Sequence, residues 1–297
     1  MRKRHISDKE LDNLLDQLSE SVRSPKGKYT AENSFSHLQG KLSYKSPHKI
    51  SFLLKYIAAA SVVIILMLST YFLLDNNHRP ETITLTTSRN TKEVVLPDGS
   101  HVVLSHFSSL QYPSEFTGRD RIVKLSGEAY FDVTPNKKHP FSVHSGDICV
   151  TVLGTQFNVQ AYSNDTCIKT TLIEGKVAVK SWSDHNRTTI LNPNETAYFS
   201  KQTGELYKET NENAMNEIAW KEGKLIFENK PLAEIATTLT HYFNVQIKID
   251  NQHLQAYKMT ARFEQNENIE EIINILQAGA DFKWRKEKNT IIINSNN

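Results

Sequence analysis

The stretch VVLPDGSHVVL, residues Val94–Leu104, decides the fold class of the largest part of this chain. Two apolar runs flank Asp98-Gly99, and glycine tolerates the positive φ angle that a tight turn requires. The pattern therefore predicts a β-hairpin. Short alternating runs of the same kind continue to about residue 202, and turn residues separate them, so we expect a mainly-β domain over residues 82–202.

Further strands are expected along this domain, with Gly127 and Gly154 at bends between them and not in a cofactor-binding loop. A disulfide between Cys149 and Cys167, both in strand-like runs, would require an oxidising compartment and suitable geometry, so their pairing stays open. The expected strands are 122–125, 129–133, 141–143, 148–153, 157–162, 168–173 and 177–179.

The composition changes after about residue 214, where helical periodicity appears. A helix is predicted from about residue 232, after Asn229 and Pro231, and a strand follows it. A second unit repeats this order, with Asn268 and Glu271 spaced as the capping pair of its helix, and a hairpin ends the chain. We therefore expect a small α+β domain of two strand–helix–strand units over residues 218–295.

An uncharged run of 19 residues, 56–74, precedes the β domain. As a helix it would extend about 28 Å, which approaches the hydrocarbon thickness of a bilayer. Because about 50 mostly polar residues come before it, a transmembrane helix is favoured over a signal peptide, and its lack of a polar face disfavours a buried core helix. Four lysines, Lys41, Lys45, Lys49 and Lys55, lie just before the run and predict a cytoplasmic N-terminus.

Residues 1–50 form the predicted cytoplasmic head. Ser7 and Glu10 are spaced as a capping box, and an apolar stripe at helical spacing follows them. A short helix cannot bury such a stripe against itself, so it requires a partner or the membrane surface. The head is thus either a docking segment or a membrane-proximal amphipathic helix. The stripe consists of Leu11, Leu14, Leu15, Leu18 and Val22.

Composition and spacing argue against several other classes of function. The formal net charge of +2 over 297 residues is too small to indicate a nucleic-acid surface. Glu128 and Asp132 share a face of one predicted strand but would lie about 13 Å apart, beyond the separation of paired catalytic carboxylates, so we interpret them as turn and surface residues. The histidines do not converge as metal ligands. We expect no catalytic, cofactor or metal site.

Four ordered blocks resemble the FecR family: Leu96–Phe116, Leu125–Val133, His139–Tyr162 and Glu174–Lys180. Residues 220–247 resemble the C-terminal domain that often accompanies this β domain, which is itself similar to the short N-terminal domain of secretins and TonB-dependent receptors. The resemblance implies an anti-sigma factor of the bacterial inner membrane with a periplasmic C-terminal region. It further implies two partners, a cytoplasmic extracytoplasmic-function sigma factor and the signalling domain of an outer-membrane TonB-dependent transducer.

The head lacks the tryptophan-containing pattern common in this family, so sigma binding by its apolar stripe is a hypothesis. The alternative is a membrane-anchored periplasmic binding or scaffold protein without sigma regulation. The stripe discriminates between the two, because a simple anchor does not require it.

Overall fold

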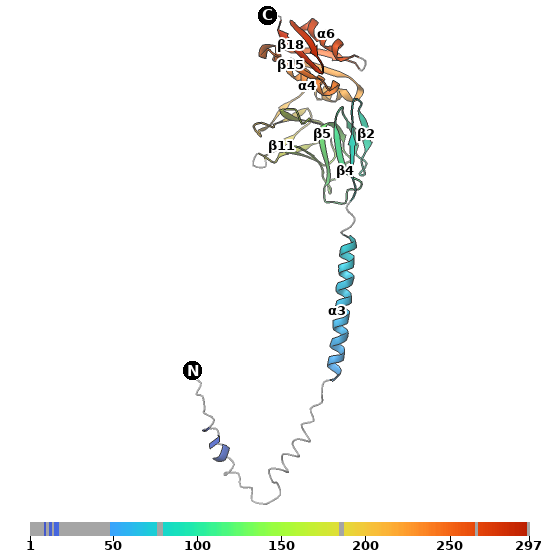
Figure 1. Cartoon of the computed structure of the whole chain (residues 1–297), viewed down its shortest axis with the longest axis vertical. Coiled ribbons are helices and arrows are strands. Elements are labelled where there is room, and N and C mark those ends of the chain that lie inside the picture. Colours follow the sequence, from blue (N-terminus) through green and yellow to red (C-terminus); the bar gives the residue numbers. More distant parts are fainter. Residues whose placement is uncertain are drawn as a thin grey trace, which may run out of the picture. The chain divides into compact units, whose positions relative to one another are not determined.

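The computed structural model describes residues 9, 12–13, 15–17, 48–75, 80–183, 187–264 and 267–295. The chain divides into two compact units, Met1–His78 and Arg79–Asn297. In the first unit, α3 is a single helix, His48–Asp75 (Figure 1), and its large apolar side chains between Tyr56 and Tyr71 are exposed. Within the described ranges, no helix is both long and apolar enough to cross a membrane, so the span predicted at 56–74 is not supported.

The second unit begins with a β domain whose strands pair into one 13-stranded arrangement of two sheets. The first sheet contains β1, β4, β6, β7, β10 and β11, the second contains β2, β3, β8, β9, β12 and β13, and β5 belongs to both. The strands are β1 Thr82–Thr86, β2 Lys92–Val95, β3 His101–Leu104, β4 Ser109–Pro113, β5 Arg121–Asp132, β6 Phe141–Ser145, β7 Ile148–Val152, β8 Gln156–Ala161, β9 Cys167–Glu174, β10 Val177–Ser181, β11 Thr188–Leu191, β12 Glu195–Ser200 and β13 Leu206–Thr210.

Strand β5 joins the two sheets because it bends without ending. Its first half pairs with β4 and, in parallel, with β6, whereas residues from Gly127 onward pair with β8 and β3. The sequence predicted two strands here, 122–125 and 129–133, which is wrong. Gly127 has a φ of 101°, and a Cβ atom there would lie 2.7 Å from the Cα of Ser108. Glycine thus permits both the bend and the close approach of the neighbouring chain.

The predicted hairpin around Asp98-Gly99 is confirmed, and its aspartate does more than form a turn. Gly99 has a φ of 82°, and Asp98 accepts hydrogen bonds from the backbone N–H and hydroxyl of Ser100. The same carboxylate pairs at 2.5 Å with the guanidinium of Arg121, which is 4% exposed. The hairpin is therefore tied to the start of β5 through a buried ion pair, which is costly to break from one side.

The sheets enclose a core of aliphatic and phenylalanine side chains. Phe131, Phe141 and Phe157 are fully buried, and the rings of Phe131 and Phe157 stack with centroids 5.1 Å apart. Cys149 is buried and Cys167 half-buried, and both are free thiols. The disulfide left open by the sequence is therefore absent.

The C-terminal module follows a 3₁₀ helix, η1 Ala214–Glu222, and has a separate core. Both predicted strand–helix–strand units are present, and the predicted capping box of Asn268 and Glu271 forms at the start of α6. β14 pairs with β16, while β18 lies between β15 and β17. The elements are β14 Leu225–Pro231, α4 Leu232–Phe243, β15 Gln246–Ile249, α5 Gln252–Gln255, β16 Lys258–Phe263, α6 Ile269–Gly279, β17 Phe282–Glu287 and β18 Thr290–Ser295.

Candidate functional site

The outer face of the second sheet meets the C-terminal module at a junction formed through η1, which contacts β9 on one side and β14 on the other. Tyr130 of β5 forms a buried apolar cluster with Ile218 and Trp220 of η1. The ammonium of Lys221 lies 3.5 Å from the centroid of the Tyr130 ring, a cation–π contact. This face of the sheet is therefore covered by the module that follows it in the chain.

A cavity of about 60 Å³ lies within the junction, enough for a few water molecules. Strands β5, β8 and β9 line it from the β domain and β14 and α4 line it from the C-terminal module, with η1 between the two. Most of the charged side chains on its wall come from residues that the sequence analysis did not select. The charged side chains are Glu128, which the sequence analysis interpreted as a surface residue, and Lys169, Glu217, Lys224, Lys230 and Glu234, which it did not select; His241 lines the cavity as well.

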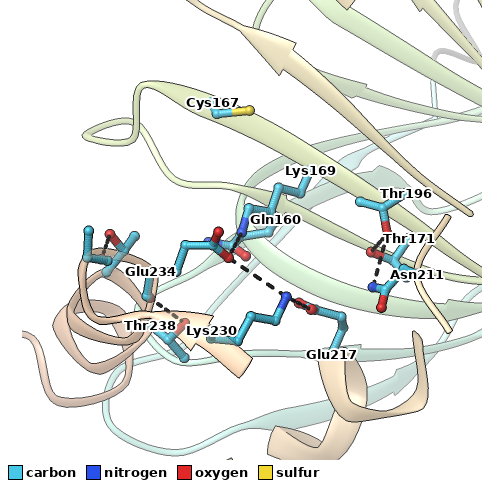
Figure 2. A network of polar contacts seen from close by, with 12 residues as sticks. Gln160, Cys167, Lys169, Thr171, Thr196, Asn211, Glu217, Lys230, Glu234 and Thr238 are labelled. Atoms are coloured by element: carbon cyan, nitrogen blue, oxygen red, sulfur yellow. Dashed lines mark hydrogen bonds and ion pairs between the residues drawn. The ribbon is translucent and has the colours of Figure 1, made fainter. Parts of the chain in front are cut away.

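Two lysines and two glutamates form an ion-pair network across the junction (Figure 2). Nζ of Lys169, on β9, lies 3.4 Å from Oε2 of Glu234, on α4. Nζ of Lys230 lies 3.0 Å from Oε1 of Glu217 and 3.8 Å from Oε2 of Glu234. Burial opposes the charge on both lysines, but the two carboxylates outweigh it and raise the pKa of each. We name these four residues the junction network.

Glu128 faces the same cavity from the middle of β5. Burial raises its pKa to about 8, and the nearby carboxylate of Glu217 acts in the same direction, although Asn158 donates a hydrogen bond of 2.8 Å to its Oε1. The prediction that Glu128 is a turn and surface residue is therefore wrong. Strand alternation correctly placed it outside the core of the β domain, but the C-terminal module covers that face.

A second polar contact crosses the junction beside the network. Nε2 of His241, on α4, lies 2.7 Å from Oδ1 of Asp165, in the turn between β8 and β9. The His241 ring stacks on Tyr162 with centroids 3.8 Å apart, and the Tyr162 hydroxyl donates a hydrogen bond to the carbonyl of His106. This stack fixes the orientation of α4 on the β domain.

The polar side chains of this junction are of a kind that can form and break contacts between the β domain and the C-terminal module. Its lysines and carboxylates largely neutralise one another, and across the described part of the chain no three His, Cys, Asp or Glu side chains converge as a metal site. Polar, hydrated contacts between modules exchange more readily than large apolar ones. Two buried polar atoms, Nε1 of Trp220 and Oδ1 of Asn158, have no hydrogen-bond partner among the described residues.

The residues predicted to bind a sigma factor are mostly outside the described part of the chain. Leu15 is described, and its side chain is 56% exposed. Its helical neighbours Asp16 and Gln17 are described as well. The other members of the stripe, Leu11, Leu14, Leu18 and Val22, lie outside the described residues, so the sigma-binding stripe stays a prediction.

Two family models match the second unit. The model described as FecR protein matches residues 83–178, and the model described as FecR, C-terminal matches residues 224–293. The first covers most of the β domain and the second the module beyond the junction. No curated protein matches the chain.

Two solved structures resemble the second unit closely. Both are crystal structures of a "putative anti-sigma factor" from Parabacteroides distasonis. One is 29% identical with a TM-score of 0.65, and this match covers 72% of the present chain and 100% of the solved chain. The other is 28% identical with a TM-score of 0.64, covering 73% and 100% of the two chains.

Proposed function

Because the chain belongs to the FecR family, we propose that it is an anti-sigma factor that carries a signal across a bacterial inner membrane. The observation that carries this proposal is the match to solved chains described as a "putative anti-sigma factor", which extends over the whole length of those chains. The protein would act by binding a regulator and not by catalysis, in keeping with the mutual neutralisation of the junction network.

The proposed division of the chain has four parts: a cytoplasmic sigma-binding head at 1–50, a membrane anchor at 56–74, a periplasmic β domain at 82–202 and the C-terminal domain at 218–295. Support for the anchor comes from the exposed apolar side chains of α3, which water would solvate poorly. The uncharged run of 19 residues supports it as well. The lysines before this run favour a cytoplasmic N-terminus.

Two partners complete the proposal. In the periplasm the second unit receives the signalling domain of an outer-membrane TonB-dependent transducer, and in the cytoplasm the head holds a sigma factor of the extracytoplasmic-function class. Binding at the junction would change the contact between the β domain and the C-terminal domain, which includes two exchangeable polar pairs, Lys169 with Glu234 and His241 with Asp165.

The test is co-purification of sigma factors with the full-length protein from its own cells. Leu14→Asp and Leu18→Asp each place a charge on the apolar stripe and should abolish capture of the sigma factor. Asn13→Asp is the matched control, because it adds the same charge to the opposite side of the same helix and should leave capture intact.

A different outcome would favour the alternative function. If all three variants capture the sigma factor as the wild type does, the apolar stripe is not the contact face. If the wild-type protein captures no sigma factor, the head is only an anchor. The protein would then be a membrane-anchored periplasmic binding or scaffold protein without sigma regulation.

The anchor and its orientation need a separate measurement. A cysteine introduced at Ser7 or at Thr203 can be labelled by a membrane-impermeant maleimide in intact spheroplasts, with the native Cys149 and Cys167 replaced by serine. We expect labelling at Thr203 alone. Labelling at both positions, or at Ser7 alone, would contradict the proposed orientation.

A further inference from the structure

A larger pocket opens beside the junction cavity and shares residues with it. Its volume is about 670 Å³, within the range of about 300–1,000 Å³ typical of small-molecule sites. Both the β domain and the C-terminal module line it, the former through the segments before β2 and after β3, the latter through the end of α4 and the start of α6. A molecule bound there would contact both modules.

The lining combines aromatic rings with cations. Phe107, Trp220 and Tyr242 contribute aromatic surface, and Phe107 has a φ of 49°, a conformation that a bulky residue rarely adopts outside a constrained site. The indole N–H of Trp220 is buried and has no hydrogen-bond partner within the described ranges. A ligand or water that accepted from this N–H would remove the cost of leaving it unsatisfied.

The charge of the lining is of one sign. Arg89, Lys221 and Lys286 line the pocket, and in the part of the chain that the structure describes no aspartate or glutamate does. Lys286 is already paired with Glu270 outside the lining. Among the described residues Arg89 forms no ion pair. Arg89 and Lys221 are therefore the charges available to a ligand.

Lys221 is partly buried, and this environment disfavours the charged form of its side chain. Burial lowers its pKa, and the surrounding carboxylates of Glu222, Asp132 and Glu93 offset this only in part. The ring of Tyr130 lies under its ammonium group. An anion bound in the pocket would offset the rest of the cost of burying the Lys221 charge. The site therefore favours a negatively charged ligand.

We propose that this pocket binds a small organic anion with a flat apolar ring. The ring would lie against Phe107, Trp220 and Tyr242, and the acid group would pair with Arg89 and Lys221. A second pocket on the junction has the opposite character, since five glutamates line it with two lysines, and it would repel the same molecule. The proposal does not depend on the sigma-binding function.

The test uses the full-length protein in lipid nanodiscs and a matched pair of probes, 2-naphthoate and 2-naphthamide. The two probes share a ring and differ in charge. Equilibrium dialysis against the loaded nanodiscs, with empty nanodiscs as the blank, should give an affinity for the naphthoate at least about fivefold higher than for the amide.

Two variants test whether Arg89 and Lys221 pair with the acid group of the probe, and a third variant serves as the control. Arg89→Gln and Lys221→Gln should each weaken naphthoate binding about fivefold and leave naphthamide binding unchanged. Lys283→Gln removes a lysine from β17, the strand that carries Lys286, but Lys283 does not line the pocket, so this variant should bind as the wild type does. Near-ultraviolet circular dichroism establishes that each variant is folded.

Three results would overturn the proposal: no naphthoate binding at millimolar concentration, equal affinity for both probes, or equal weakening in the Lys283 variant. Each would mean that the pocket does not select a ring-bearing anion. Weaker naphthoate binding in the Arg89 and Lys221 variants alone, with naphthamide binding unchanged, supports it directly.

Discussion

Replacing Glu128 by glutamine removes a titrating group from the junction while keeping its size and the oxygen that accepts from Asn158. The carboxyl has a pKa of about 8 in the folded protein, against an ordinary value of 4.5. The folded state thus holds its proton more tightly than the unfolded state does. Stability from this group is fully present below about pH 4.5 and is lost as the pH rises towards 8.

The size of the effect follows from the same two values. The difference between a pKa of 4.5 in the unfolded state and about 8 in the folded state corresponds to roughly 4 to 5 kcal/mol of unfolding free energy if solvent does not screen the charge. Because the side chain keeps some access to solvent in the cavity, we expect about half of that, roughly 2 kcal/mol. Glu128→Gln should therefore stabilise the fold by about 2 kcal/mol near pH 8.5 and hardly at all near pH 5.

The assay is urea unfolding followed by tryptophan fluorescence at the two pH values, since Trp220 is buried in the junction. Glu115→Gln, at an exposed glutamate of the β domain, is the control and should show no such pH dependence. A stabilisation by Glu128→Gln that is the same at both pH values would refute the reasoning, because it would show that the charge of Glu128 carries no cost in the junction.

The remaining predictions concern single elements of the second unit. Gly127→Ala should lower the free energy of unfolding by about 3 kcal/mol or more, because the new methyl group would meet Ser108 at a φ that alanine rarely adopts; an unchanged melting temperature would contradict this. Asn268→Ala should cost about 1 kcal/mol and raise amide exchange in the first turn of α6, through loss of the capping box, while Asn274→Ala, within the same helix, should leave that turn unaffected.

Local features of the fold were predictable from the sequence because they depend on neighbouring residues. The Asp98-Gly99 turn, the cap of α6 and the two strand–helix–strand units each arise within about 30 residues of chain. The continuity of β5 was not predictable. A glycine within a strand pattern signals a bend, and nothing in the sequence says whether the strand resumes in the same sheet or in another.

The junction was missed for a related reason. Alternation along β5 identifies Glu128, Tyr130 and Asp132 as one face, but it cannot show that η1 and α4 will cover that face. Lys169 and Glu234 are 65 positions apart, and neither stands in a recognisable motif. A tyrosine between two carboxylates on a strand predicted to face water was the one available signal, since a large aromatic ring seldom lies unprotected there.

The shared strand β5 also has a mechanical consequence. A force that pulls on the C-terminal module acts on the second sheet through the junction, and β5 carries that load directly into the first sheet. Neither sheet can separate from the other until β5 loses its hydrogen bonds on one side, either those to β3 and β8 or those to β4 and β6. The β domain should therefore resist tension as a single block and yield in one step.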